Sequence, residues 1–369
     1  MSCTENQQRQ TYVNEKDSLF MLVGSYASAH EEGIKLYSFN QNSGETSYIS
    51  GISGVSNPSY LTISKDKKRV YAVSENDTDD SAAQALSLDL AKGKLALLNA
   101  KLTRGAAPCY IALSPREDFV VTANYNGGNI SIFPLNEKGE LEEPQVISFE
   151  GHGPDTERQE KSHLHCTVFS PDEKHMLASD LGADCLHLFA VNEQDKKIST
   201  SLLNESSQRD LMMPVGSGPR HIVFAPNKKF VYVVTELSGD VIVMEYKGAN
   251  SKIIQTIKAD TLGARGSGDI HLTPDGQYLY ASNRLQGDGI AIFKVDTLTG
   301  MLTKVGYQPT GNHPRNFVIS PNGKFLLVAC RFSNEIEVYL INEATGLLKD
   351  SGKRIKTSEP TCLKFVDGK

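Results

Sequence analysis

One phrase recurs six times along this chain of 369 residues. Each copy joins an apolar run, a small residue that is usually followed by proline, a polar turn and a second apolar run. We call the small residues the markers, and they are Ser64, Ser114, Ser170, Ala225, Thr273 and Ser320. They are spaced by 50, 56, 55, 48 and 47 residues, and a degenerate seventh copy follows at residues 363–368. A repeat of this length is typical of proteins built from many copies of one small unit.

Each period contains four short runs that have the composition of β-strands. In the fourth period these are residues 220–224, 230–235, 240–246 and 253–258, which are rich in Val, Ile, Tyr and Phe. No segment shows a helical period over a dozen residues. Four strands in about 50 residues form one blade of a propeller. We therefore predict an all-β protein with seven blades, and the absence of Trp excludes a WD40 propeller.

The two ends of the chain each supply part of one blade. Residues 361–366 give one strand before the chain ends, whereas the strands predicted at 19–24 and 34–39 have no inner strand before them. Pairing the two ends would complete the seventh blade and leave no free sheet edge in the ring. We therefore expect a single propeller domain over residues 18–369, closed by N- and C-terminal strands, after a disordered tail at residues 1–17.

Charge and cysteine content limit the class of protein. A net charge of −6 argues against a general nucleic-acid binder, which usually carries an excess of basic residues. No apolar run approaches the ~20 residues of a membrane span. The six cysteines form no CxxC pair, so we expect reduced thiols and a cytoplasmic protein. The alternative is a periplasmic lipoprotein anchored through Cys3, since Met1-Ser2-Cys3 resembles the end of a bacterial lipobox whose start codon would lie upstream.

Propeller geometry converts position in the repeat into position in space. The innermost strand of each blade starts at the central channel, and the next strand runs antiparallel and returns to the same rim. Residues five before each marker, and ten or eleven after it, should therefore converge at one end of the channel. These positions and their neighbours are polar or charged in nearly every blade. The candidate site residues are His163, His165, Asp180, Arg220, His221, Glu236, Asn283, Arg284, His313 and Arg315.

The common catalytic motifs are absent from the sequence, which has no GxSxG, P-loop, dinucleotide-binding GxGxxG or HExxH pattern. His163 and His165 form an HxH pair, which on a strand places both rings on one face and could suggest a metal. However, no carboxylate follows with clear ligand spacing, and Arg220 and Arg284 would disfavour a dication. We therefore expect no metal and no other cofactor. The gathered cations and imidazoles instead suggest a site for a small anionic molecule.

Seven stretches within residues 19–366 resemble the lactonase family of seven-bladed propellers, typified by the propeller type of 6-phosphogluconolactonase and related to the carboxymuconate cyclases. They are residues 123–128 (ANYNGG), 158–165 (RQEKSHLH), 180–184 (DLGAD), 218–221 (GPRH), 236–237 (EL), 282–284 (SNR) and 313–317 (HPRNF). The resemblance implies hydrolysis of a sugar lactone, with 6-phosphogluconolactone of the pentose phosphate pathway as the expected substrate. It also implies an active site at His165, Arg220, Glu236 and Arg284.

The expected roles follow from the chemistry of lactone opening. A lactone is an activated ester, so the reaction needs a base for water and charge stabilisation at the carbonyl, but no covalent nucleophile. Glu236 or His165 would be the base, or Glu236 would instead orient Arg220 as its salt-bridge partner. Arg220 would stabilise the oxyanion, and Arg284, with Arg315, would hold the phosphate.

Two other functions fit the same sequence. A lactonase or cyclase acting on a carboxylate lactone, such as a muconolactone, would use the same arginines to hold a carboxylate. A non-enzymatic propeller scaffold would need an apolar or aromatic rim, whereas the rim predicted here consists of Arg and His. The oligomeric state is left open by the sequence.

Overall fold

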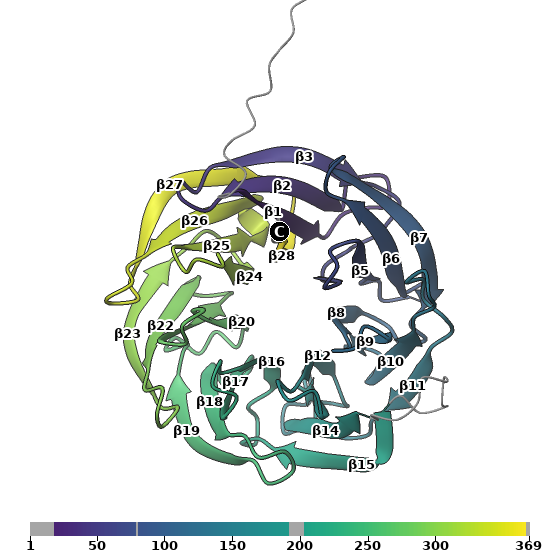
Figure 1. The fold of residues 1–369 in the computed structure, drawn as a ribbon. Helices are drawn as coiled ribbons and strands as arrows, with labels where there is room; N and C mark the ends of the chain where they lie inside the picture. The colour runs from purple at the N-terminus through teal and green to yellow at the C-terminus, as the bar shows by residue number, and fades with distance from the viewer. Residues whose placement is uncertain (1–17, 79, 192–202, 367–369) are drawn as a thin grey trace, which may run out of the picture.

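The computed structural model describes residues 18–78, 80–191 and 203–366, which form seven four-stranded antiparallel sheets arranged in a ring (Figure 1). The predicted all-β, seven-bladed propeller is confirmed. The only helical element among these residues is the short 3-10 turn η1 (Arg331–Ser333). The described residues form no helix that is long and apolar enough to cross a membrane. The expected N-terminal tail, with Cys3, lies outside the described residues.

Six blades are built from consecutive strands that run from the centre of the ring outward (Figure 1). In chain order the strands are β4 (Leu61–Ile63), β5 (Arg69–Ser74), β6 (Ala82–Asp89) and β7 (Lys94–Leu102); β8 (Pro108–Leu113), β9 (Phe119–Asn124), β10 (Asn129–Pro134) and β11 (Gln145–Ser148); β12 (Leu164–Phe169), β13 (His175–Asp180), β14 (Cys185–Val191) and β15 (Leu203–Met212); β16 (Pro219–Phe224), β17 (Phe230–Thr235), β18 (Asp240–Glu245) and β19 (Lys252–Lys258); β20 (Ser267–Leu272), β21 (Tyr278–Asn283), β22 (Gly289–Val295) and β23 (Leu302–Pro309); β24 (Pro314–Ile319), β25 (Phe325–Cys330), β26 (Glu335–Ile341) and β27 (Leu348–Lys356).

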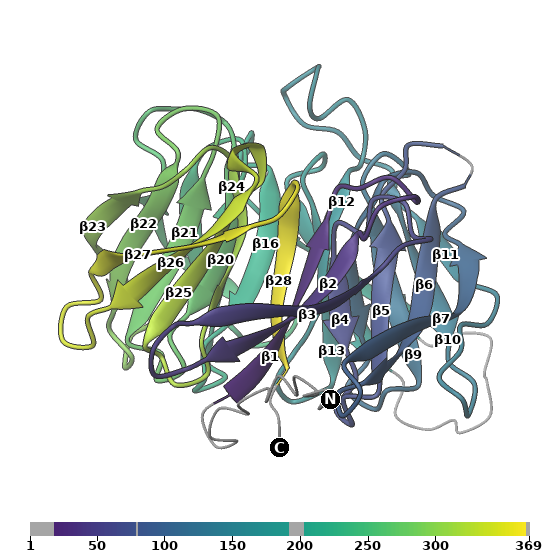
Figure 2. The ribbon, with the colours of Figure 1, turned by 90° about the horizontal axis from the view of Figure 1, so that it is seen from above.

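The seventh blade joins the two ends of the described chain. It consists of β28 (Pro360–Val366), β1 (Ser18–Ser25), β2 (Ile34–Asn40) and β3 (Thr46–Ile52), in that order from the centre. β1 and β28 pair antiparallel from Phe20–Val366 to Ser25–Pro360, and Figure 2 shows the yellow β28 beside the purple β1. This pairing confirms the shared blade predicted from the sequence.

The recurring phrase is the tight hairpin between the first and second strands of a blade. In the third complete blade, the hydroxyl of Ser170 accepts the backbone N–H of His175 at 3.0 Å and donates to Asp172. The hydroxyls of Ser64, Thr273 and Ser320 make the matching contacts in their own blades. The residue three after each marker has a left-handed backbone, with φ between 59° and 72°, at Lys67, Glu117, Glu173, Lys228, Gly276 and Gly323. The phrase therefore recurs in the sequence because each of these hairpin turns needs a hydroxyl or small residue at its start and a left-handed residue three positions later.

The hydrophobic core lies between the blades. The second strands β9, β17, β21 and β25 are buried along their whole length, because a neighbouring blade covers each face. Phe39 of one blade, for example, packs edge-on against Phe325 of the next, with ring centroids 5.6 Å apart. These strands are therefore apolar over most of their length, as expected for strands that are covered on both faces.

Candidate active site

The start of each inner strand lies beside the end of the second strand, because the two pair antiparallel. The pair Pro219–Thr235 of β16 and β17 places Arg220 next to Glu236. One blade further on, Arg284 directly follows β21 and reaches the same carboxylate. Side chains from two blades therefore meet around a single acidic group.

Glu236 is held by three arginines. Its Oε2 lies 2.7 Å from Nε of Arg220 and 3.1 Å from Nη2 of Arg284, and its Oε1 lies 2.6 Å from Nη2 of Arg158. Arg220 is 1% exposed, Arg284 5% and Glu236 7%. Three guanidinium groups around one carboxylate leave an excess of positive charge in a mostly buried place, which an anionic ligand would balance.

The same arginines decide the protonation of Glu236. Burial alone would raise the pKa of the carboxyl, but Arg284, Arg220 and Arg158 outweigh burial and lower it to about 2. A carboxylate with so low a pKa is a weak proton acceptor. Glu236 is therefore suited to holding arginines in place rather than to removing a proton.

His165, on β12, lies beside this cluster. Its Nε2 is 4.0 Å from Oε2 of Glu236, and its Nδ1 is 3.6 Å from Sγ of Cys109. Burial, followed by the charges of Arg220 and neighbouring groups, lowers the pKa of His165 well below its usual value. The ring is therefore neutral near pH 7, which leaves a nitrogen lone pair available, and the same shift makes it a weaker base than a free imidazole.

His221 fixes the orientation of Arg220. Nη1 of Arg220 donates to Nε2 of His221 at 3.2 Å, and Nδ1 of His221 lies 2.7 Å from Oδ1 of Asp269. A guanidinium can only donate, so Nε2 carries no proton and Nδ1–H donates to Asp269. Burial and then Arg220 lower the pKa of His221 to about 4, in agreement with a neutral ring. Asp269, His221 and Arg220 thus form a chain that ends at Glu236.

Arg315 belongs to a second group of charges. Its Nη2 lies 3.5 Å from Oε1 of Glu75, and its guanidinium is 5.4 Å from the ring centre of Tyr26. Arg331 lies over the same ring at 4.1 Å. Glu75 also accepts hydrogen bonds from the hydroxyls of Tyr26, at 2.6 Å, and Ser59. Within the described part of the chain, Arg315 has most of its donor groups uncommitted, whereas Arg220 and Arg284 both donate to backbone carbonyls as well as to Glu236.

Two further histidines border the arginines. His313 is buried, its Nδ1 has no hydrogen-bond partner among the described residues, and burial followed by Arg284 and Arg315 lowers its pKa to about 3. The ring of His163 stacks on Tyr125 with centroids 4.4 Å apart. His313 therefore lies near the arginines with a free ring nitrogen, whereas the ring nitrogens of His163 contact the carbonyl of Tyr125 at 3.0 Å and Glu160 at 3.1 Å.

Two candidates face away from the cluster. Asp180 accepts the backbone N–H of His163 at 2.8 Å and pairs with His187 at 3.2 Å. Asn283 accepts from the hydroxyl of Ser267 and donates to the backbone carbonyl of Ala259, which follows β19 of the preceding blade. Both stand ten residues after their markers, whereas Glu236 and Arg284 stand eleven after theirs. Successive side chains on a strand alternate in direction, and this alternation could have separated the two sets.

Sequence reasoning did not select Arg158, Tyr125 and Glu75. Arg158 lies in the long loop between β11 and β12, where repeat numbering gives no position. It contacts both Glu236 and, at 3.4 Å, the hydroxyl of Tyr125. Tyr125 and Glu75 stand eleven residues after their markers, as Glu236 does, and that shared spacing was the available signal.

Fold and site together define a seven-bladed propeller with a cation-rich cluster at the starts of its inner strands. The family described as Lactonase, 7-bladed beta-propeller matches residues 20–365, and the chain belongs to this family. It is 35% identical to a 6-phosphogluconolactonase of Formosa agariphila, over 89% of this chain and 94% of the relative, and 33% identical to one of Bacillus subtilis, over 93% and 97%.

Solved structures give the same picture. A Bacteroides fragilis protein proposed to be a 6-phosphogluconolactonase is 48% identical, with a TM-score of 0.92 over 96% of this chain and 100% of that one. The periplasmic gluconolactonase of Pseudomonas aeruginosa is 30% identical, with a TM-score of 0.87 over 95% and 99%.

Proposed function

We propose that this chain is a hydrolase that opens a sugar lactone, and that its substrate is 6-phosphogluconolactone, an intermediate of the pentose phosphate pathway. The observation that carries the proposal is the sharing of Glu236 by Arg158, Arg220 and Arg284, which leaves buried positive charge for an anionic substrate. The names of the relatives from Formosa agariphila and Bacillus subtilis support this substrate.

His165 is the proposed general base, and Arg220 the proposed oxyanion-stabilising group. The neutral ring of His165 accepts a proton from the attacking water. Arg220 is held rigidly by Glu236 and His221, so little reorganisation is needed as charge develops on the carbonyl oxygen. A bound phosphate would offset part of the positive charge near His165, which would make the imidazole more basic when substrate is present.

Arg315 is the proposed principal contact of the substrate phosphate. Arg284 donates from Nε to the carbonyl of Gly266 at 2.8 Å and also pairs with Glu236. Arg315 has a side chain that is 15% exposed, and within the described residues its one ion pair is the 3.5 Å contact with Glu75. Its planar donors are therefore available for a bidentate contact with phosphate.

Replacing Arg315 tests this assignment. Arg315→Ala should raise KM for 6-phosphogluconolactone about 10- to 1000-fold and leave KM for gluconolactone nearly unchanged. Arg331→Ala is the matched control, since Arg331 stacks on the same Tyr26 but is already paired with Glu359. Rates are measured with correction for spontaneous lactone hydrolysis. An equal rise in KM for both lactones would show that Arg315 does not bind the phosphate group.

A panel of lactones separates the rival functions. Turnover of a carboxylate lactone in preference to a sugar lactone would support the alternative function, a lactonase or cyclase that acts on a muconolactone-type substrate. Faster turnover of gluconolactone than of its 6-phosphate would place the chain with the Pseudomonas aeruginosa neighbour, whose name specifies gluconolactone. If no lactone is hydrolysed faster than its spontaneous rate, the proposed lactonase activity is overturned and the non-enzymatic binding scaffold remains as the alternative function.

The cytoplasm is the proposed location. The five described cysteines, Cys109, Cys166, Cys185, Cys330 and Cys362, are all free and buried, which suits a reducing compartment. Fractionation of cells that produce the protein from its genomic start codon tests this. Recovery in the membrane fraction, lost on Cys3→Ser substitution, would favour the lipoprotein instead.

A further inference from the structure

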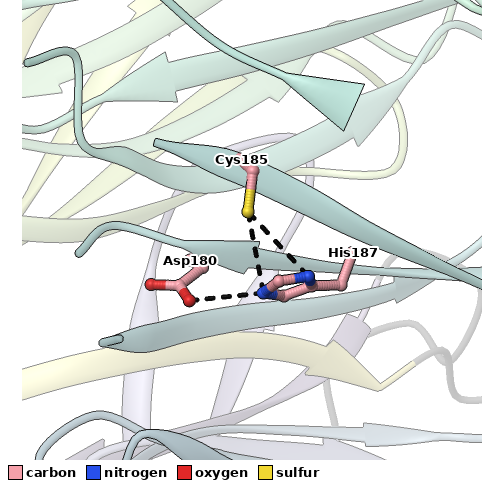
Figure 3. A group of neighbouring side chains, drawn as sticks. All are labelled: Asp180, Cys185 and His187. Carbon is pink, nitrogen blue, oxygen red and sulfur yellow. Dashed lines mark hydrogen bonds and ion pairs between the residues drawn. The ribbon is translucent and has the colours of Figure 1, made fainter. Parts of the chain in front are cut away.

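A second cluster of chemically reactive side chains lies inside the blade of β12–β15, apart from the arginines (Figure 3). Asp180 ends β13 and pairs in register with Cys185, which begins β14. His187 follows two residues later on β14, so its side chain lies on the same face as that of Cys185. All three residues are buried. Their donor atoms, an oxygen, a sulfur and a nitrogen, lie within 4.8 Å of one another.

Two of the three donor separations are those of a tetrahedral metal site, and the third, between a carboxylate oxygen of Asp180 and Sγ of Cys185, is within 4.8 Å. Oδ2 of Asp180 lies 3.2 Å from Nε2 of His187, and Sγ of Cys185 lies 3.6 Å from the same nitrogen. Ligands at the usual zinc bond lengths and tetrahedral angles would be separated by ~3.4 Å for oxygen and nitrogen and ~3.6 Å for sulfur and nitrogen. An ion could therefore be held with shifts of a few tenths of an ångström in these two separations, together with a movement of Asp180 toward Cys185.

The groups behind the ligands hold them in position. Asp210 of β15 pairs in register with His187 and lies 2.7 Å from its Nδ1, so Nδ1–H is fixed and Nε2 faces the other ligands. Oδ1 of Asp180 accepts the backbone N–H groups of His163 and Ala183, at 2.8 and 3.0 Å, which leaves Oδ2 free for a metal. A carboxylate behind a histidine is the usual support of a metal-binding imidazole.

The preceding blade has a polar group at the same positions but with different chemistry. There Asn124 ends β9, and its Nδ2 donates to Asn129 at 2.6 Å and to Ser131 at 2.8 Å. Amide and hydroxyl groups satisfy one another as neutral hydrogen-bond partners. The donor set of the β13–β14 hairpin is instead a carboxylate, a thiol and an imidazole, and the last two favour zinc-like ions over Mg²⁺ and Ca²⁺.

We propose that Asp180, Cys185 and His187 bind one divalent transition ion of the zinc class, with the fourth position filled from solvent. Without metal, both ring nitrogens of His187 lie against carboxylates and carry protons, and Cys185 is a thiol. Binding breaks the S–H bond and the Nε2–H bond, and both protons leave to solvent. The divalent ion adds two positive charges and the two departing protons remove two, so the net charge of the cluster does not change.

The site serves structure, not the reaction. Asp180 joins the metal to the backbone of His163 at the entrance to β12, the strand that carries His165. The ring of Phe149 stacks on His187 with centroids 4.1 Å apart and covers it. Metal binding should therefore stabilise the folded protein, because the unfolded chain does not assemble the ligands.

Cobalt(II) titration of the full chain, stripped of metal with a chelator, tests the proposal. One Co²⁺ per chain should bind and give the near-ultraviolet sulfur-to-cobalt absorption that only a bound thiolate produces, and Zn²⁺ should displace it. Cys185→Ser should abolish this absorption. Cys330→Ser, which removes a buried thiol from another blade, is the matched control and should leave it unchanged.

Asp210→Asn is the second variant, since the side chain of Asp210 is 46% exposed and its replacement leaves all three ligands in place. It should weaken Co²⁺ binding about 10- to 100-fold. Zn²⁺ should raise the melting temperature of the unaltered protein but not that of Cys185→Ser. Absence of the thiolate absorption, its persistence in Cys185→Ser, or unchanged affinity in Asp210→Asn would each overturn the proposal in favour of a metal-free ion pair.

Discussion

Glu236 and His165 approach to 4.0 Å, yet their surroundings suit them to different tasks. His165→Asn removes the neutral ring nitrogen and should lower kcat about 10²- to 10⁴-fold with little change in KM. Glu236→Gln removes the charge that three buried arginines share. It should destabilise the fold by about 3–5 kcal/mol and lower kcat through misplaced arginines. Steady-state kinetics and urea unfolding on both variants check these results.

The outcomes separate the two roles. A Glu236→Gln variant of normal stability that loses only kcat would identify Glu236 as the base. Full activity in both variants would remove both residues from the mechanism.

Histidines that are buried without charge make the stability of the fold depend on pH. Burial and nearby arginines lower the pKa of His221 to about 4 and of His313 to about 3, whereas an unfolded histidine titrates near ~6.5. As the pH falls below ~6.5, these histidines bind protons in the unfolded chain but stay neutral in the folded chain, so the free energy of unfolding decreases.

The expected slope approaches about 1.4 kcal/mol per pH unit for each such histidine. Urea unfolding between pH 7 and 5, above the main carboxylate range, measures it. His221→Asn should reduce the slope. Stability that stays constant or rises over this range would show that the folded state accommodates the imidazolium.

The candidate site could be predicted in part at the level of residues. The repeat numbering identified His165, Arg220, Glu236 and Arg284, because antiparallel pairing alone brings inner-strand starts to second-strand ends. It could not say which arginine has free donors, since that depends on backbone carbonyls such as Gly266 that carry no signal in the sequence.

At the level of the hairpin, the left-handed turn residue should control stability. In Gly323→Ala the added Cβ would meet nothing closer than Cδ of Pro274, at 3.7 Å, so the cost is one of backbone conformation alone. At φ 72° this should destabilise the protein by about 1–2 kcal/mol, offset in part by lower entropy of the unfolded chain. Glu173→Gly, at the equivalent turn, should be neutral or stabilising.

Thermal or urea unfolding of the two variants provides the measurement. A loss of stability in Glu173→Gly equal to that in Gly323→Ala would contradict the conformational explanation.

Strands were more predictable than the loops that join them. The runs predicted in the fourth period agree with β16–β19 to within one residue at each end, because turn residues punctuate every strand. The loop between β11 and β12 has no such periodicity, and its contribution of Arg158 to the site depends on a contact with the next blade but one.

For the whole molecule, ring closure and the site are connected. Asn316 donates from Nδ2 to Asp269, which orients His221, and its Oδ1 accepts the backbone N–H of Leu363 in β28 at 2.7 Å. Deleting residues 1–40 removes β1 and β2 and leaves β28 without its partner. The shortened chain should be unfolded and inactive by circular dichroism and lactone assay. A native-like, active protein after this deletion would refute the dependence on the shared blade.

The shared blade also sets the order of events during synthesis on the ribosome. Phe20 and Val366 pair in the finished ring but lie 346 residues apart in the chain. At ~5–20 residues per second, β1 waits about 20 to 70 seconds for its partner strand. Throughout that time the backbone N–H and C=O groups on the inner edge of β1 are unpaired and can pair incorrectly with another strand. The nascent chain should therefore depend on chaperones more than its finished stability suggests, and activity should first appear only after β28 has left the ribosome.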